Sequence, residues 1–426
     1  MNEILNIKYE KHVLENGLEV VLYQDKSLPI VSVNLWYKVG SANEVDGKTG
    51  FAHLFEHMMF QGSKNVPKEK HFKFIEEAGG NLNGSTSLDR TNYYETLPSN
   101  SLELALWLES DRMGFLLESL TQDKLDNQKD VVMNERRQRY DNQPYGLAWE
   151  IIFSNLFPKK HPYHWPTIGW MKDIEKFELD DVIDFFKKYY SPNNASLVVA
   201  GDIEYNSALQ LVKKYFDEIP KGKPFAEVSV TSEILTENKK IVHQDNIQLS
   251  KIYLAWETAK LYDTDDATLD VLSDILTGSK NGRLFQSLVF EKQIAQDISS
   301  FQYSASLTGM FIIIATAKPE VSLDELKAGI EEVLAEIIEN GITEKEFNRA
   351  INTVKSSFIY SLQNLNSLAN QINNYNTNLG EPNSFIPDLE RFQKLDYVSI
   401  KIAANKYFNN PYVELHIVPK EVNNAN

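Results

Sequence analysis

Two histidines and a glutamate stand together in the stretch His53-Leu-Phe-Glu56-His57. On a helix each residue turns by about 100°, so the three side chains share one face and the two imidazoles lie one turn apart. Two neutral imidazoles at this spacing can bind one divalent cation, and the glutamate beside them can accept a proton from an attacking water. The stretch therefore indicates metal-dependent hydrolysis.

The same residues could also belong to an ordinary surface helix that carries two exposed histidines and a solvated acid. The flanking residues argue against this alternative, because they are apolar and predict a largely buried helix. A buried helix with three ionisable groups on one face needs something to satisfy them. The apolar flank consists of Phe51, Ala52, Leu54, Phe55, Met58, Met59 and Phe60.

A catalytic zinc site usually has three protein ligands and one open position. The chain has no cysteine, so the third ligand must be a histidine or a carboxylate. Glu135 is a candidate, because it follows the apolar residues 131–133 in a long helical pattern. A surface acid paired with a neighbouring arginine is the alternative for Glu135. His161 and His164 fit a hydrogen-bonded loop better than a second metal site, because no acid lies at ligand spacing.

Composition excludes several classes of function. The chain has 426 residues, and 43 Lys and Arg against 60 Asp and Glu give a net charge of −17, which argues against nucleic acid as a partner. The longest apolar runs, such as residues 310–317, are too short to span a bilayer. The first residues resemble no signal peptide, so a cytoplasmic location is expected, or a periplasmic one if a leader has been removed.

The pattern of strands and helices occurs twice. Alternating strands are expected at 18–23 and 30–38, and again at 240–243 and 251–256, each pair followed by helices. This repetition predicts two homologous modules in an α+β fold, each a mostly antiparallel sheet covered by helices. We expect a metal-bearing module at 1–222, a linker at 223–235 and a second module without metal at 236–426.

Several segments together resemble the pitrilysin-type metallopeptidases, the inverted zincins. The resemblance covers nearly the whole chain, and its length is similar to that of the short two-module branch, which includes bacterial peptidases and the mitochondrial processing peptidase. The matching segments are His53-x-x-Glu56-His57, Val131-Val-Met-Asn-Glu135-Arg-Arg, residues 79–86, residues 189–202 and residues 282–288.

The resemblance implies an endopeptidase that cuts unfolded peptides. His53, His57 and Glu135 would bind one Zn²⁺ per chain, and Glu56 would be the general base.

The peptide substrate would add as a strand beside Asn83, Gly84 and Ser85, although a plain sheet strand ending near Gly84 is an alternative. Phe60 resembles a position that lines the pocket beyond the scissile bond, and core packing would explain it as well.

Two departures from the family pattern bear on activity. Gln128 stands where active relatives usually carry a second, supporting glutamate, which alters the charge near the metal site. Val289 and Gln296 stand where active relatives carry an arginine and a tyrosine that hold the substrate, and Arg283 belongs to the preceding turn. We therefore expect a heterodimer with a related subunit that supplies the Arg/Tyr pair. A weakly active homodimer and a scaffold subunit without catalysis are the alternatives.

Overall fold

A computed structural model describes residues 5–230 and 235–420. The chain separates into two compact units that exchange segments. Unit 1 comprises Met1–Arg136, Trp165–Val228 and Ile359–Ile386, and unit 2 comprises Arg137–His164, Ser229–Phe358 and Pro387–Asn426. Residues 137–164 thus belong to unit 2 and residues 359–386 to unit 1, which a single linker between two consecutive modules does not describe. The predicted boundaries at 222 and 236 stay a prediction.

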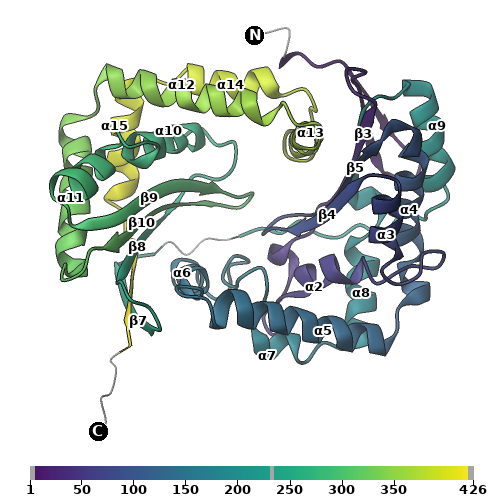
Figure 1. The fold of residues 1–426 in the computed structure, drawn as a ribbon, viewed down its shortest axis with the longest axis horizontal. Coiled ribbons are helices and arrows are strands. Elements are labelled where there is room, and N and C mark those ends of the chain that lie inside the picture. Colours follow the sequence, from purple (N-terminus) through teal and green to yellow (C-terminus); the bar gives the residue numbers. More distant parts are fainter. Residues whose placement is uncertain (1–4, 231–234, 421–426) are drawn as a thin grey trace. The chain divides into compact units, whose positions relative to one another are not determined.

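Unit 1 is built on a six-stranded sheet with the order β1-β2-β6-β3-β5-β4 (Figure 1). Only β2 and β6 pair in parallel, and the other neighbours are antiparallel. Its strands are β1 (Tyr9–Val13), β2 (Glu19–Gln24), β3 (Ile30–Tyr37), β4 (Asn81–Thr86), β5 (Thr91–Pro98) and β6 (Ala195–Gly201).

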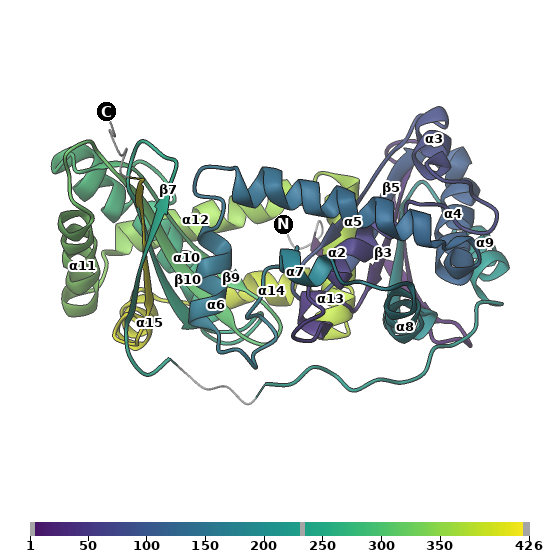
Figure 2. The same cartoon turned by 90° about the horizontal axis from the view of Figure 1, so that it is seen from below.

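Helices cover both faces of this sheet. Helices α4 and α9 lie along one face, and α13, from the C-terminal half of the chain, lies along the other (Figure 1). Helix α2 packs against α5 at one end of the sheet (Figure 2). The helices of unit 1 are α2 (Phe51–Met58), α3 (Lys70–Glu77), α4 (Leu102–Phe115), α5 (Gln122–Arg136), α7 (Met171–Ile174), α8 (Leu179–Tyr189), α9 (Tyr205–Phe216) and α13 (Leu365–Leu379).

Asparagines attach α13 to the sheet of unit 1. Asn370 accepts a hydrogen bond from the indole of Trp36, and the buried Asn373 donates to the main chain of Asn34. Asn376 donates to Ser196 on β6. These asparagines recur every three residues, so one face of the helix carries the whole set.

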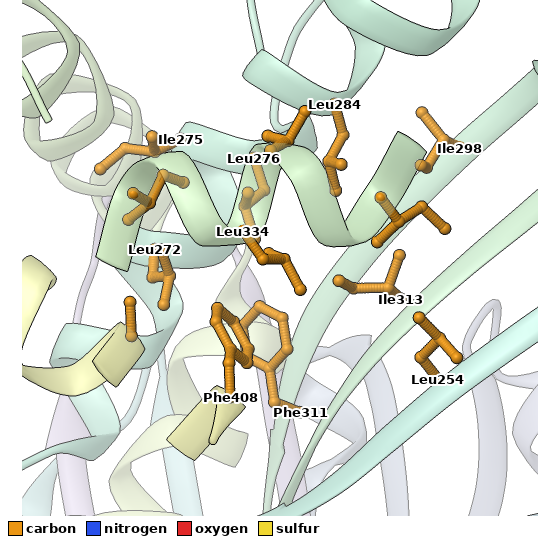
Figure 3. Close-up of a cluster of buried hydrophobic side chains, with 14 of the residues drawn as sticks. Leu254, Leu272, Ile275, Leu276, Leu284, Ile298, Phe311, Ile313, Leu334 and Phe408 are labelled. Atoms are coloured by element: carbon orange, nitrogen blue, oxygen red, sulfur yellow. The ribbon is translucent and has the colours of Figure 1, made fainter. Parts of the chain in front are cut away.

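Unit 2 has a five-stranded sheet with the order β7-β11-β8-β10-β9. Helices α10, α11 and α15 enclose an apolar core on one face of it, where Leu254, Phe311 and Phe408 are buried together (Figure 3). The strands are β7 (Lys239–Asp245), β8 (Lys251–Thr258), β9 (Ala295–Ser304), β10 (Gly309–Ala317) and β11 (Val413–Pro419). The helices are α6 (Ala148–Leu156), α10 (Asp266–Thr277), α11 (Leu323–Asn340), α12 (Glu344–Ser361), α14 (Phe385–Gln393) and α15 (Tyr397–Phe408), and α12 and α14 each continue into residues of unit 1.

The two sheets repeat one topology. In each, a parallel pair is followed by three antiparallel neighbours: β2-β6-β3-β5-β4 in unit 1 and β7-β11-β8-β10-β9 in unit 2. The sheet of unit 1 has β1 as an additional edge strand. The predicted α+β fold with two related, mostly antiparallel modules is confirmed. Across the described residues, no helix is long and apolar enough to cross a bilayer.

Candidate active site

Helix α2 presents its polar residues on a single face. Its apolar side chains, such as Leu54 and Phe55, are fully buried, whereas His53 and His57 keep 13% and 23% of their side-chain surface exposed. The sequence produces this division because the apolar residues occupy the remaining positions of each turn. The two imidazoles thus point away from the core with their ring centroids 4.9 Å apart.

Glu135, near the C-terminal end of α5, completes a cluster of three possible metal ligands. Its Oε2 lies 3.2 Å from Nε2 of His57 and 3.8 Å from Nε2 of His53. All three donor atoms lie within 4.8 Å of one another. Ligands at about 2.0–2.1 Å from a tetrahedral zinc ion are about 3.3 Å apart, so these separations match the size of such a site.

Glu56 lies beside this cluster and is held from the edge of the sheet. The hydroxyl of Thr86 donates a 2.7 Å hydrogen bond to its Oε2. A β-carbon on Gly84 would lie 3.2 Å from Cγ of Glu56, so a glycine lets the strand approach the carboxyl closely. Burial raises the pKa of Glu56, while the Thr86 hydrogen bond and the nearby His57 lower it.

A buried carboxyl group caps the N-terminus of α2. The two oxygens of Glu44 accept 2.8 Å hydrogen bonds from the main-chain N–H groups of Gly50 and Ala52. These N–H groups have no partner inside the helix, and a carboxylate also interacts favourably with the positive end of the helix dipole. Burial raises the pKa of Glu44 to about 8, although the two main-chain donors lower it. Glu44 thereby fixes where α2 begins.

The loop that ends at Trp170, directly before α7, contacts both helices that carry the ligands. Arg136, which follows Glu135, donates to the carbonyl of Gly169 at 3.0 Å, and the N–H of Trp170 donates to the hydroxyl of Thr49 at 2.9 Å. Gly169 also packs directly on the start of α2, since a β-carbon there would lie 2.4 Å from Cα of Gly50. The separation between His57 and Glu135 therefore depends on this loop.

Strand β4 is an edge strand, with β5 as its neighbour in the sheet of unit 1. The N–H of Ser87 donates to the carbonyl of Arg90 across the hairpin, and the pairing runs without a register shift to Asn81. In an antiparallel pair the direction of the main-chain groups alternates, so Ser85 and Asn83 direct theirs toward β5 and Gly84 directs its own toward the open edge. The carbonyl of Gly84 thus faces the open edge, while its N–H donates a 2.9 Å hydrogen bond to Oδ1 of Asn83. Pairing of a substrate with Asn83, Gly84 and Ser85 stays a prediction.

A charged cluster is buried next to this strand. The guanidinium of Arg112 lies 4.1 Å from the ring centroid of Tyr93 and is paired with Glu109 and Glu95. Burial and the neighbouring Glu109 raise the pKa of Glu95 well above its ordinary value, which favours the protonated form of Glu95 in this cluster. The ring of Tyr93 in turn packs against Gly84, which couples this cluster to the strand beside Glu56.

The two remaining predicted site residues are Phe60, which follows α2, and Gln128, which lies on α5. Phe60 is partly exposed and packs on Phe72 and Tyr93, with ring centroids 4.6 and 5.7 Å away, so its position fits both core packing and a pocket wall. Gln128 lies two turns before Glu135 on α5, is 5% exposed, and donates to the side chain of Asn127.

The other histidines and the arginine considered in the sequence form hydrogen bonds and ion pairs away from this cluster. Nδ1 of His161 accepts a hydrogen bond from the N–H of Tyr163, and His164 bonds the carbonyl of Phe157 through its Nδ1. Arg283 forms a bidentate pair with Glu346.

Two contributors to the site were missed in the sequence. Thr86 could have been found, because it lies two residues beyond Gly84 and alternate residues of a strand share a face. Glu44 could not have been found in the sequence. It lies six residues before Gly50, whereas known capping motifs place the capping side chain within a few residues of the helix start.

Comparisons with known proteins identify the family of this chain. Residues 19–162 match the family model described as Insulinase (Peptidase family M16), and residues 176–354 match the model described as Peptidase M16 inactive domain. The zinc protease PqqE of Helicobacter pylori is 31% identical over 95% of this chain and 91% of its own length. A probable mitochondrial-processing peptidase subunit beta of Arabidopsis thaliana is 25% identical over 92% of this chain and 75% of its own length.

Among solved structures, the crystal structure of a protease from Helicobacter pylori superposes with a TM-score of 0.90 and 30% identity, covering 97% of this chain and all of the other. The duplicated fold and the His-x-x-Glu-His helix thus define a two-module protein of the inverted-zincin class. The chain belongs to peptidase family M16, and the resemblance noted in the sequence is confirmed.

Proposed function

We propose that this chain is the metal-bearing subunit of a zinc-dependent endopeptidase that cuts unfolded peptides. The observation that supports it most is the convergence of His53, His57 and Glu135 next to a carboxyl, Glu56, that a neighbouring strand holds in place. Relatives that carry the name zinc protease add to this support.

The donor set suits zinc. Two imidazole nitrogens and one carboxylate oxygen are typical ligands of catalytic zinc, and three ligands leave a position open. His53, His57 and Glu135 would hold one ion per chain. When bound, zinc polarises the scissile carbonyl and lowers the pKa of water.

The chain's own residues would perform the remaining steps. Glu56 accepts the proton of the attacking water and returns it to the departing amine, and Thr86 holds its carboxyl group in the required orientation. The substrate lies as an added strand along β4 beside Asn83, Gly84 and Ser85, paired with the outward main-chain groups of this strand. Because main-chain hydrogen bonds carry little side-chain information, we expect loose sequence selectivity.

We further propose that the active form is a heterodimer. Val289 is partly buried against the core of unit 2 and Gln296 is exposed, and neither can provide the positive charge or the phenol found in active relatives. Arg283 cannot replace the missing arginine, because both of its bonds to Glu346 are already made. A related subunit would supply the Arg/Tyr pair.

The test is an assay of peptide cleavage by the purified chain, alone and mixed with a related subunit that carries the Arg/Tyr pair. Losing one oxyanion donor typically reduces the rate by about 10²–10³, so we expect the mixture to be at least about a hundredfold faster. Equal rates with and without the second subunit would refute the heterodimer. Glu56→Gln in the mixture should retain zinc and lose turnover, with Glu76→Gln, an exposed acid on α3, as the matched control.

A scaffold role is the second candidate. The family model that matches residues 176–354 carries the description inactive domain, and Gln128, Val289 and Gln296 depart from the pattern of active relatives. A chain that holds no zinc and remains inactive with every related subunit would favour the scaffold.

A further inference from the structure

A cavity in unit 1 lies outside the candidate active site. It is a half-open hollow with a volume of about 830 Å³, lined by the end of α4, by α8 and by the segment 219–226. None of His53, Glu56, His57 and Glu135 is among the described residues that line it. Its volume is within the range of about 300–1,000 Å³ that is typical of small-molecule sites.

The inner wall of the cavity is apolar. Leu117, just after α4, Phe186 of α8 and Phe225 of the 219–226 segment all contribute to it. Phe186 is buried and its ring lies 5.8 Å from that of Tyr190, with the two planes inclined by only 2°. An apolar chain or ring placed here would lose its contact with water on several sides.

The rim of the cavity is positively charged, although the whole chain has a net charge of −17. Lys187, Lys188, Lys221 and Lys223 line it, and all four are exposed. None of them forms an ion pair with any described residue, and Asp184 is the one acid among the described lining residues. Lysines without an ion pair around an apolar wall are complementary to a molecule with an apolar body and an anionic head, and the ammonium of Lys188 otherwise lies 4.7 Å from the ring centroid of Tyr189.

The segment 219–226 is anchored at Gly222 to the residues that follow α8. The N–H of Gly222 donates to Oδ1 of Asn193 at 2.7 Å. A β-carbon on Gly222 would lie 2.2 Å from Oγ of Ser191, so the two chains touch. Ser191 is only 7% exposed, lines the cavity, and its hydroxyl has no hydrogen-bond partner among the described residues. A buried hydroxyl without a partner is available to a polar ligand group.

We propose that this cavity binds a small amphipathic anion, a molecule with an apolar body of medium length and one carboxylate or phosphate head. The body lies against Phe186 and Leu117, and the head is bound by the lysines of the rim. This site is separate from the peptidase proposal and does not depend on it.

The test is calorimetric titration of the full chain with decanoate and with decyl phosphate. We expect one saturable site for at least one of these anions, and binding at least about tenfold weaker for decanol and for inorganic phosphate, which each lack one half of the recognised chemistry. The anion that binds more tightly identifies the preferred head group. No saturable binding of either anion, or equal binding of decanol, would overturn the proposal.

Charge reversal provides a second measurement. Lys221→Glu combined with Lys223→Glu should weaken binding of the anions at least about tenfold without changing the melting temperature, because both side chains are exposed. The matched control is Lys159→Glu with Lys160→Glu, an exposed pair outside the cavity that changes the net charge equally. Equal weakening in both double variants would show a long-range charge effect and refute the site.

Discussion

The loop that contacts the two ligand-bearing helices can be tested by adding one methyl group. Gly169 has φ +80°, and a β-carbon there would lie 2.4 Å from both Cα of Gly50 and the carbonyl oxygen of Thr49. These are main-chain atoms that cannot rotate away. Contacts under 3.0 Å are essentially never seen and those at 3.4 Å are ordinary, so Gly169→Ala must separate the loop from the start of α2 by about 0.6–1 Å.

Gly47 provides a matched control. Its φ of +85° is nearly the same, but a β-carbon there would meet no atom within 4 Å. An L-residue in this conformation costs about 1–2 kcal/mol, so Gly47→Ala should lower the free energy of unfolding by about that amount and leave zinc binding unchanged. Gly169→Ala should lose an additional amount of about 1–3 kcal/mol through overpacking.

The zinc affinity should separate the two variants more clearly. A shift of this size changes the distances from Glu135 to His53 and His57, now 3.8 and 3.2 Å, and groups that orient metal ligands typically affect affinity by about 10–100-fold. Competition with a chelator would measure the affinity, and denaturant titration the stability. If Gly169→Ala bound zinc as tightly as Gly47→Ala, the loop would not set the geometry of the site.

Three further substitutions test other parts of the structure. Thr86→Val removes the 2.7 Å hydrogen bond to Glu56, and we expect the kcat of the complete enzyme to fall about tenfold with zinc content unchanged; an unaltered kcat would contradict the role of Thr86. Burial raises the pKa of Asp270 to about 7 from an ordinary 3.8, so ionisation opposes folding increasingly from about pH 4 to 7. Asp270→Asn should therefore raise the free energy of unfolding at pH 8, by at most about 4 kcal/mol, and change it little at pH 4, as denaturant titrations at both pH values would show. Arg112→Leu removes the buried cation that is paired with Glu109 and should lower the free energy of unfolding by about 3–5 kcal/mol, and a loss below about 1 kcal/mol in the same titration would contradict a stabilising role of this pair.

Local patterns in the sequence were sufficient to predict much of the fold. The strand expected at 30–38 is β3 (Ile30–Tyr37), and the one expected at 251–256 is β8 (Lys251–Thr258), because β-branched and aromatic residues alternate there. The repeat of the two modules was also visible, since the same order of elements recurs. The exchange of 137–164 and 359–386 between the compact units was not, because contacts between distant segments leave no local signal.

The candidate site was predicted to a similar degree. His53 and His57 follow from helical spacing, and Glu135 from the family pattern. Thr86 and Glu44 depend on how β4 and the loop before Gly50 approach α2, which only the tertiary structure reveals. The cavity beside α8 was equally hidden, because its lysines come from two segments more than thirty residues apart.

The most direct test of the account is a crystal grown with zinc and measured at the zinc absorption edge. We predict one anomalous peak per chain, about 2.0–2.2 Å from Nε2 of His53, Nε2 of His57 and a carboxylate oxygen of Glu135. A map in which zinc is absent from this position, or in which Glu135 points away from both histidines, would contradict the central claim.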